Sequence, residues 1–342
     1  MNTHSVFAVQ VVATKSFGGI ETAALAYAHM FDELGIPSVC LYRGPGTEML
    51  SSAGVTVMPL PDTLTGPLKY IPFVAMPIIS KLKTLAGKRT LLFVVHSDLA
   101  LQALRRHFPQ AKFVAPCHSD KATRKKDADL AITLNKKQQA HVETILEGHR
   151  AKAVELGNPF ITSRKKAPAS DKMRIVFCAR FTPVKNPLAV IKAHACLNNP
   201  PPLLMIGDGD LMGEAREAAG DDVEFLGWRG DPWQHISRDD ILISPSSWEG
   251  LPYMILEALD RGVPVIASDI AGHCAALNDG DYGTLTPLGD HAALVATVQE
   301  AIANPNVLRD KAEKGIHSIS TRFGPKYFWQ RLSSALSEKP AV

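Results

Sequence analysis

Short apolar runs alternate with helix-like segments along most of the chain, and the pattern occurs once in each half. In the first half the apolar runs cover residues 6–13, 38–42, 91–95, 112–117 and 130–133. In the second half they cover residues 174–179, 203–206, 223–226, 241–244 and 263–267. Short apolar runs separated by helix-length segments are typical of buried parallel strands in α/β proteins. The pattern predicts two Rossmann-like, doubly wound domains in tandem.

A polar stretch at residues 162–172 separates the two halves, and its composition is typical of a linker. We therefore expect a first domain over residues 1–161 and a second over residues 162–324. With 342 residues in all, each domain is large enough to bury a core. Open α/β sheets bind ligands outside the carboxyl ends of their strands. A site in a cleft between two such domains is the expectation that follows.

Composition and charge narrow the class of protein. The sequence has no run of 18 or more apolar residues, so it offers no membrane-spanning segment. The net charge of +3 is too small to indicate nucleic-acid binding. The first residues, Met-Asn-Thr-His, lack the basic region of a secretory signal. We therefore expect a cytoplasmic protein.

Residues 245–270 contain the strongest candidate for a binding site. Two glutamates, Glu249 and Glu257, lie eight positions apart. Glu249 falls in a turn beside Gly250, whereas Glu257 falls inside a helix that Pro252 can start, since proline suits the first helical position. The spacing alone would also suit a solvated helix face. The flanking glycine, proline and serine residues favour a loop and helix that carry both carboxylates toward a ligand.

The setting of these glutamates is Pro-Ser-x-x-Glu-Gly-x-Pro, followed by Glu-Ala and Gly-x-Pro-Val-Ile-Ala. It resembles the donor-binding signature of retaining glycosyltransferases of family 4, the glycosyl transferases group 1. The resemblance is strong over residues 173–320 and weaker over residues 1–160. It implies an α/β protein of the GT-B fold, with two Rossmann-like doubly wound domains facing across a cleft. It also implies that a C-terminal helix within residues 325–342 packs back on the N-terminal domain.

The resemblance assigns roles to individual residues. Glu249 would contact hydroxyls of the transferred sugar, and Glu257 would bind the ribose of the nucleotide. Arg180 and Lys185 form an Arg-x4-Lys pair that would bind the donor diphosphate; two solvated surface cations are the alternative. Further donor-binding positions are Gly18, Gly19, Gly207, Gly250, Leu251, Pro252 and Tyr253.

Two histidines follow predicted strands of the first domain. His118 is similar in placement to the active-site histidine of the family, which would orient the donor sugar; a polar residue at a strand end is the alternative. His96 follows another strand, and we expect it on the acceptor side. Asp208 and Asp210 have no histidine or further acid beside them, so we expect no metal.

Peripheral membrane contact is a separate hypothesis. Apolar side chains within residues 69–89 lie beside Lys81, Lys83, Lys88 and Arg89. A second basic cluster comprises Lys121, Arg124, Lys125 and Lys126. Such a mixture can lie on an anionic lipid surface, although burial against the sheet would explain the apolar residues equally well.

We predict an enzyme of the hexosyltransferase type, EC 2.4. It would move a sugar from a nucleotide-diphosphate sugar to a hydroxyl of a glycan or lipid-linked acceptor, with retention and without a metal or other cofactor. Bacterial lipopolysaccharide or surface polysaccharide synthesis, at the inner face of the plasma membrane, would suit it. The alternatives are a catalytically silent GT-B protein that binds nucleotide sugar, and a GT-B nucleotide-sugar epimerase. The epimerase would require further acids in the first domain, which the sequence does not identify.

Overall fold

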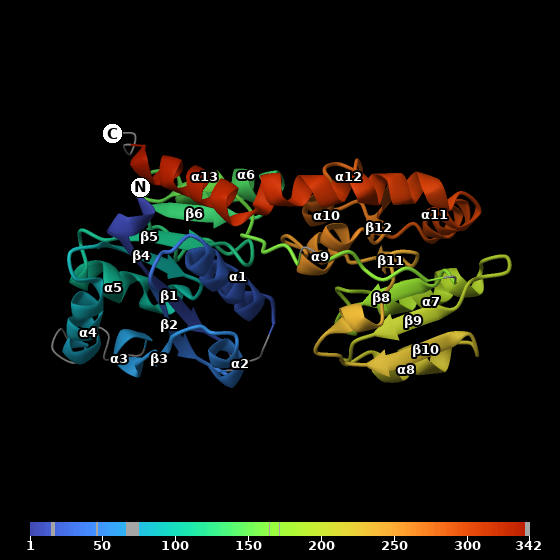
Figure 1. Ribbon diagram of the computed structural model, residues 1–342, viewed down its shortest axis with the longest axis horizontal. Helices are drawn as coiled ribbons and strands as arrows, with labels where there is room; N and C mark the ends of the chain where they lie inside the picture. Colours follow the sequence, from blue (N-terminus) through green and yellow to red (C-terminus); the bar gives the residue numbers. More distant parts are fainter. Residues whose placement is uncertain (15–17, 46, 66–74, 164, 171, 339–342) are drawn as a thin grey trace. The chain divides into compact units, whose positions relative to one another are not determined.

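The computed structural model describes residues 1–14, 18–45, 47–65, 75–163, 165–170 and 172–338. The chain forms two compact units (Figure 1). Unit 1 consists of Met1–Ile161 together with Arg322–Val342, and unit 2 consists of Thr162–Thr321. Each unit is built on one parallel sheet covered by helices, so the prediction of two Rossmann-like domains is confirmed.

Seven parallel strands make up the sheet of unit 1, in the order β3-β2-β1-β4-β5-β6-β7. Their bounds are β1 (Val6–Ala13), β2 (Ser38–Arg43), β3 (Val57–Pro59), β4 (Thr90–Val95), β5 (Lys112–Pro116), β6 (Leu130–Thr133) and β7 (Lys152–Glu155). Successive side chains of a strand point to opposite faces of the sheet. Phe7 and Val9 accordingly join one apolar core, whereas Val6 and Ala8 join another. A strand covered on both faces is expected to be apolar on both, and all residues of β1 except Gln10 are apolar.

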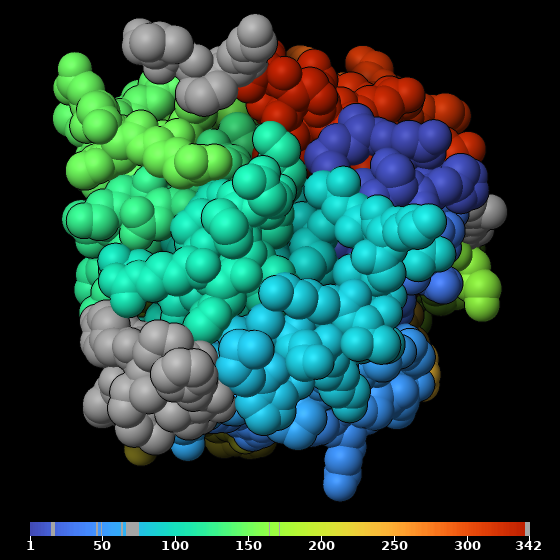
Figure 2. Space-filling model, turned by 90° about the vertical axis from the view of Figure 1, so that its left-hand side faces the viewer, coloured from blue at the N-terminus to red at the C-terminus, as the bar shows by residue number. Residues whose placement is uncertain are grey.

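Helices from both ends of the chain cover the sheet of unit 1. They are α1 (Gly19–Glu33), α2 (Thr47–Ser52), α3 (Asp62–Thr65), α4 (Met76–Ala86), α5 (Leu101–His107), α6 (Lys136–Leu146) and α13 (Pro325–Ser337). In α13, Phe328, Trp329 and Leu332 are buried in the same core as Tyr27 of α1. The C-terminal helix therefore belongs to unit 1, and Figure 2 shows its red surface beside the blue N-terminal residues.

Unit 2 has six parallel strands in the order β10-β9-β8-β11-β12-β13. Their bounds are β8 (Ile175–Cys178), β9 (Leu203–Ile206), β10 (Val223–Gly227), β11 (Ile241–Ser244), β12 (Val265–Ser268) and β13 (Thr284–Thr286). The helices are α7 (Pro187–Ala195), α8 (Met212–Ala218), α9 (Tyr253–Arg261), α10 (Ala271–Leu277), α11 (His291–Ala303) and α12 (Pro305–Phe323), the last of which leads into unit 1. Val190 of α7, Ala215 of α8 and Val298 of α11 share one apolar core with residues of β8 and β11.

Two prolines mark the starts of helices α9 and α4. Pro252 is the residue before α9, not its first residue, and it has extended backbone angles. Pro77 is the second residue of α4 and so lies at its start, where a proline is tolerated because that N–H has no helical partner. Pro77 therefore does not interrupt α4. Residues 69–74 of the segment considered for membrane contact lie outside the described residues.

The described part of the membrane-contact segment is a surface helix with one buried face. Ile79 and Leu82 of α4 are buried in the core of unit 1, whereas Met76 and Leu85 are exposed. The proposed second basic cluster needs a correction, because Lys125 is only 3% exposed and pairs with Asp98. Among the described residues, no helix is both long enough and apolar enough to cross a membrane.

Candidate donor-binding site and a histidine cluster

The strand order of unit 2 reverses between β8 and β11, because the chain runs β8-β9-β10 to one side and then returns to β11 on the other. In doubly wound sheets, ligands bind beyond the carboxyl ends of the strands at such a reversal. The loop after β8 carries Arg180 and Lys185, and the loop after β11 carries Glu249. The fold therefore brings these three predicted residues to the edge of the sheet where a ligand site is expected.

Lys185 and Glu249 join the two loops. The Lys185 ammonium forms an ion pair with Glu249 Oε1, which also accepts a hydrogen bond of 3.0 Å from Ser246 Oγ. The backbone N–H of Ser247 donates to the carbonyl of Val184 at 2.8 Å, so the backbones of the loops are bonded as well. The side chains of Lys185 and Glu249 are 23% and 12% exposed. Such partial burial reduces screening of their charges by salt.

Helix α10 packs against the backbone of Glu249 through a glycine. A Cβ atom added to Gly272 would lie 2.3 Å from the Glu249 carbonyl oxygen, so no other residue fits there without movement. The next residue, His273, donates from Nδ1 to the Ser268 carbonyl at 2.7 Å, which leaves Nε2 to accept from Ser244 Oγ at 3.1 Å. Burial lowers the pKa of His273 and favours this neutral form. The close packing and the hydrogen bonds fix the loop that presents Glu249.

Glu257 lies on α9 and is held by an indole. Trp233 Nε1 donates to Glu257 Oε2 at 2.7 Å, and the Arg261 guanidinium stacks 4.5 Å from the centre of the Trp233 ring. Burial raises the pKa of Glu257, while the Trp233 hydrogen bond and the charge of Arg261 act in the opposite direction. Sequence reasoning did not identify Trp233; the only available signal was that a buried carboxylate needs a donor.

The loop that carries Arg180 is locked by two glycines of the β9–α8 turn. A Cβ at Gly207 would lie 1.9 Å from the Ala179 carbonyl oxygen, and one at Gly209 would lie 2.6 Å from that of Phe181. Both glycines have positive φ angles, of 131° and 152°. The structure thus gives Gly207 a packing role beside Arg180. The Arg180 side chain is exposed and forms no ion pair with any residue that the structure describes.

The turn between Glu249 and α9 contains the remaining predicted positions of unit 2. Gly250, Leu251 and Pro252 are buried, and α9 begins at Tyr253 without a side-chain cap. The N–H groups of a first helical turn point away from the helix and toward any ligand at its end. Burial and then the charge of Glu257 raise the pKa of the Tyr253 hydroxyl, which is therefore a neutral hydrogen-bonding group.

Unit 1 has its own reversal of strand order, between β1 and β4. Gly18 precedes α1 and Gly19 begins it, while residues 15–17 before them lie outside the described residues. The buried Glu21 carboxylate accepts from the Gly18 N–H at 2.9 Å and from the Thr14 hydroxyl. A Cβ at Gly18 or Gly19 would meet no described atom within 4 Å. The glycines therefore leave open space beside a helix start that Glu21 fixes.

The two predicted histidines are in contact. His118 follows β5 and His96 follows β4, and their Nε2 and Nδ1 atoms lie 3.0 Å apart. Behind them, Gln10 Oε1 of β1 lies 3.0 Å from His96 Nε2. His96 is 4% exposed, so little of its side chain is left to contact an acceptor, whereas His118 is only partly buried. Of the two, His118 is the side chain that can meet a ligand.

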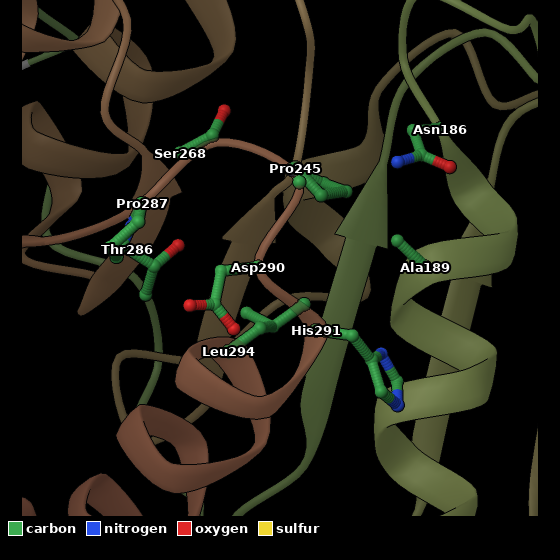
Figure 3. Close-up of a pocket in the computed structure, with 10 residues that line it drawn as sticks. Asn186, Ala189, Pro245, Ser268, Thr286, Pro287, Asp290, His291 and Leu294 are labelled. Carbon is green, nitrogen blue, oxygen red and sulfur yellow. The ribbon is translucent and has the colours of Figure 1, made fainter.

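A small cavity of unit 2, lined in part by the loops after β8 and β11, has a volume of about 70 Å³ (Figure 3). It is lined by Asn186, Ala189, Pro245, Ser268, Thr286, Pro287, Gly289, Asp290, His291 and Leu294. Small-molecule sites usually have volumes of about 300 Å³ or more. None of the predicted site residues lines this cavity, and we therefore assign the ligand to the strand reversal rather than to it. Among the described residues, no three His, Cys, Asp or Glu side chains are grouped as metal ligands.

Residues 160–317 match the family model described as "Glycosyl transferases group 1". The segment contains the Lys185 and Glu249 pair and Glu257. The chain is similar to the UDP-Gal:alpha-D-GlcNAc-diphosphoundecaprenol alpha-1,3-galactosyltransferase of Escherichia coli, with 37% identity over 32% of each chain. It is also similar to the lipopolysaccharide 1,6-galactosyltransferase of Escherichia coli K12, with 31% identity over 37% of each chain. The aligned regions thus span about a third of these curated relatives.

Solved structures resemble the chain over nearly its whole length. The crystal structure of Anabaena Alr3699/HepE in complex with UDP and glucose has a TM-score of 0.75 at 18% identity, covering 97% of this chain and 99% of that one. The lipopolysaccharide outer core galactosyltransferase WaaB in its apo form has a TM-score of 0.71 at 17% identity, with the same coverage. The predicted GT-B class of fold is confirmed, and the family match supports the prediction of a nucleotide-sugar glycosyltransferase.

Proposed function

We propose that this protein is a glycosyltransferase that moves a sugar from a nucleotide-diphosphate sugar to a hydroxyl group. One observation carries the proposal: Lys185 and Glu249 pair at the strand reversal of unit 2, within the segment that matches the glycosyltransferase family model. A cation and a carboxylate at that edge of the sheet suit a ligand with both an anionic diphosphate and sugar hydroxyls.

Arg180 and Lys185 would bind the diphosphate. As the bond between the sugar C1 atom and the diphosphate oxygen breaks, negative charge grows on the departing oxygen. Fixed cations stabilise that charge without first having to reorganise. Arg180 is exposed and forms no ion pair with a described residue, so its guanidinium has room for a phosphate. Lys185 would share its ammonium between the phosphate and Glu249.

Glu249 would bind hydroxyls of the transferred sugar, and Glu257 would bind the ribose diol. Glu257 Oε2 is already engaged by Trp233, which leaves Oε1 and the second lone pair of Oε2 to accept from hydroxyls. Burial raises the pKa of Glu257, so its ionised form is costly. Hydrogen bonds that the ribose hydroxyls donate to the carboxylate would offset this cost. Tight packing at Gly272 supports Glu249 in the same way that Trp233 supports Glu257.

The transfer would proceed with retention at C1. The acceptor oxygen would form its bond to C1 on the face from which the diphosphate oxygen leaves, and the acceptor proton would pass to that oxygen. This route needs no carboxylate as a covalent nucleophile, and it agrees with the engagement of Glu249 by Lys185 and Ser246. We further propose that the diphosphate is neutralised by Arg180 and Lys185, without a divalent metal or other cofactor.

The acceptor would be a glycan or a lipid-linked glycan of bacterial surface polysaccharide, by analogy with the galactosyltransferases that align with the chain. Transfer to a lipid-linked acceptor would take place at the cytoplasmic face of the plasma membrane. The exposed Met76 and Leu85 of α4, with the lysines of the same helix, are the described residues that could touch an anionic lipid surface.

A screen of nucleotides tests the proposal. Isothermal calorimetry of the full chain with UDP, GDP and ADP, and with common sugar conjugates of each, is repeated in the presence of a chelator. We expect selective binding of one nucleoside diphosphate that the chelator does not change. Binding without turnover of any conjugate would favour the silent binding protein. Release of an epimerised nucleotide sugar would favour the epimerase, and absence of binding would reject the site.

A further inference from the structure

Three polar side chains form a row in unit 1, from the interior of one strand to the carboxyl ends of the next two. Gln10 belongs to β1, His96 follows β4, and His118 follows β5. Gln10 Oε1 and His96 Nε2 are 3.0 Å apart, and His96 Nδ1 and His118 Nε2 are also 3.0 Å apart. Gln10 is 1% exposed and His96 is 4% exposed, so the inner two groups are closed off from water.

The chemistry of these atoms sets the direction of the hydrogen bonds. An amide oxygen can only accept, so His96 must donate to Gln10 from Nε2. A neutral imidazole carries a single N–H, and therefore Nδ1 of His96 is left as an acceptor. The proton between the rings must then belong to His118 Nε2. Nδ1 of His118 is consequently left with a lone pair.

This pattern of hydrogen bonds exists only when both rings are neutral, and their surroundings favour the neutral state. Burial lowers the pKa of His96 well below its ordinary value, and it lowers the pKa of His118 to about 3. The charge of Lys125 acts in the same direction on both rings. Lys125 is itself 3% exposed, and its ammonium is paired with the Asp98 carboxylate at 2.7 Å. The Asp120 carboxylate accepts a hydrogen bond from the side-chain amide of Gln138.

Aromatic packing holds the middle ring of the row. The ring of Tyr27 meets that of His96 edge to face, with centroids 5.2 Å apart. The rings of His96 and His118 are nearly parallel, with an interplanar angle of 17° and centroids 5.2 Å apart, as expected for two rings joined edge to edge by their hydrogen bond. The His96 imidazole therefore cannot turn to exchange its two nitrogens without disturbing the core. The orientation of His118 is set through its hydrogen bond to His96, which is itself bonded to the buried Gln10.

We infer that Gln10 and His96 are positioning residues that hold His118 with its proton on Nε2, so that its Nδ1 is presented as a hydrogen-bond acceptor. The hydrogen-bond relay stands on the geometry of unit 1 alone. Its use rests on the proposed function: His118 Nδ1 would accept a hydrogen bond from a hydroxyl of the donor sugar, and would not donate one to a sugar oxygen.

Long-range proton–nitrogen correlation spectra of the full chain test the relay without any ligand. The chain contains twelve histidines, so the signals of His118 and His96 are identified by their loss in His118→Gln and His96→Gln variants. At pH 7.5 we expect a protonated Nε2 and an unprotonated Nδ1 on His118. A His118 ring protonated on Nδ1 would overturn the inference, because it would mean that the amide of Gln10 faces His96 with its nitrogen.

The second arm uses Gln10→Met, which keeps the length of the side chain and removes the acceptor. We expect the His118 signals to show a mixture of tautomers, and sugar transfer to slow by roughly tenfold or more with donor KM changed less than about twofold. Cys117→Ala is the control, since Cys117 is buried next to His118 but lies outside the row. Unchanged tautomers and turnover in Gln10→Met would refute the relay. If neither the wild type nor Gln10→Met transfers sugar, the proposed function fails, but the spectra still show which nitrogen of His118 carries the proton.

Discussion

The ammonium of Lys185 and the carboxylate of Glu249 form an ion pair that bridges the loops after β8 and β11. These loops flank the reversal of strand order in unit 2, so the pair spans the point where a doubly wound sheet binds its ligand. From the sequence, Lys185 was assigned to a diphosphate and Glu249 to a sugar. Because the two side chains are paired, a bound diphosphate would compete with the Glu249 carboxylate for the ammonium of Lys185.

Lys185→Ala tests that coupling. It removes a phosphate ligand and also leaves a partly buried carboxylate without its counter-charge, so we expect nucleoside diphosphate affinity to fall by about 1.5–3 kcal/mol. Calorimetry measures the change. Lys192→Ala, an exposed lysine of α7, is the control and should bind as the wild type does. Equal affinity in all three proteins would remove Lys185 from the site.

Gly272→Ala tests whether close packing of α10 positions Glu249. The added methyl would meet the Glu249 carbonyl oxygen at 2.3 Å, so the loop must move. We expect sugar transfer to fall by roughly a hundredfold, as happens when a reacting group is displaced by about 1 Å. Gly213→Ala, in α8, is the matched control because its Cβ would meet nothing within 4 Å. Normal transfer by Gly272→Ala would show that the loop tolerates the shift.

Glu257→Gln and Trp233→Phe test the nucleotide side of the site. Loss of the charge in Glu257→Gln should weaken nucleotide binding by about 1–3 kcal/mol, whereas Glu217→Gln on the exposed face of α8 should not.

In the wild type, binding requires ionised Glu257, whose pKa is raised above its ordinary 4.5. Affinity should therefore fall as pH drops through that raised value. Since the indole lowers this pKa, Trp233→Phe should move the loss of affinity to higher pH.

The site illustrates what the sequence alone could and could not predict. The strands that are apolar throughout, such as β8 and β9, were predicted correctly because burial on both faces leaves a continuous apolar run. Strands β3, β7 and β13 were missed. They have only three or four residues, and their burial is incomplete, so none of them produces a distinctive apolar run.

Contacts between distant residues were the main gap. Trp233 lies 24 positions from Glu257, and Gln10 lies 86 positions from His96. No periodicity in one sequence reports such pairs, which depend on how the strands are ordered. Lys125 was misjudged for the same reason: it lies among other basic residues in the sequence, but the fold buries it against Asp98.

The buried histidines predict a loss of stability in acid. His96 and His118 have lowered pKa values in the folded chain, so below pH 6.5 the unfolded chain binds more protons than the folded one. The free energy of unfolding should therefore decrease as pH falls from 6.5 to 4, by about 1.4 kcal/mol per pH unit for each histidine. Hydrogen exchange of the β1 and β4 amides reports on unit 1 alone. His118→Gln should reduce the slope by one proton, whereas His141→Gln, on the exposed face of α6, should leave it unchanged; equal slopes in all three would contradict the account.

The central claim is that Glu249 and its partners act on a nucleotide sugar. The most direct test is to measure release of nucleoside diphosphate from UDP-, GDP- and ADP-sugars by the full chain, with a lipid-linked glycan as acceptor, and to repeat it with Glu249→Gln. We expect release from one class of donor, coupled to sugar transfer, and a decrease of about a hundredfold or more in the variant. Equal release by wild type and Glu249→Gln would contradict the account.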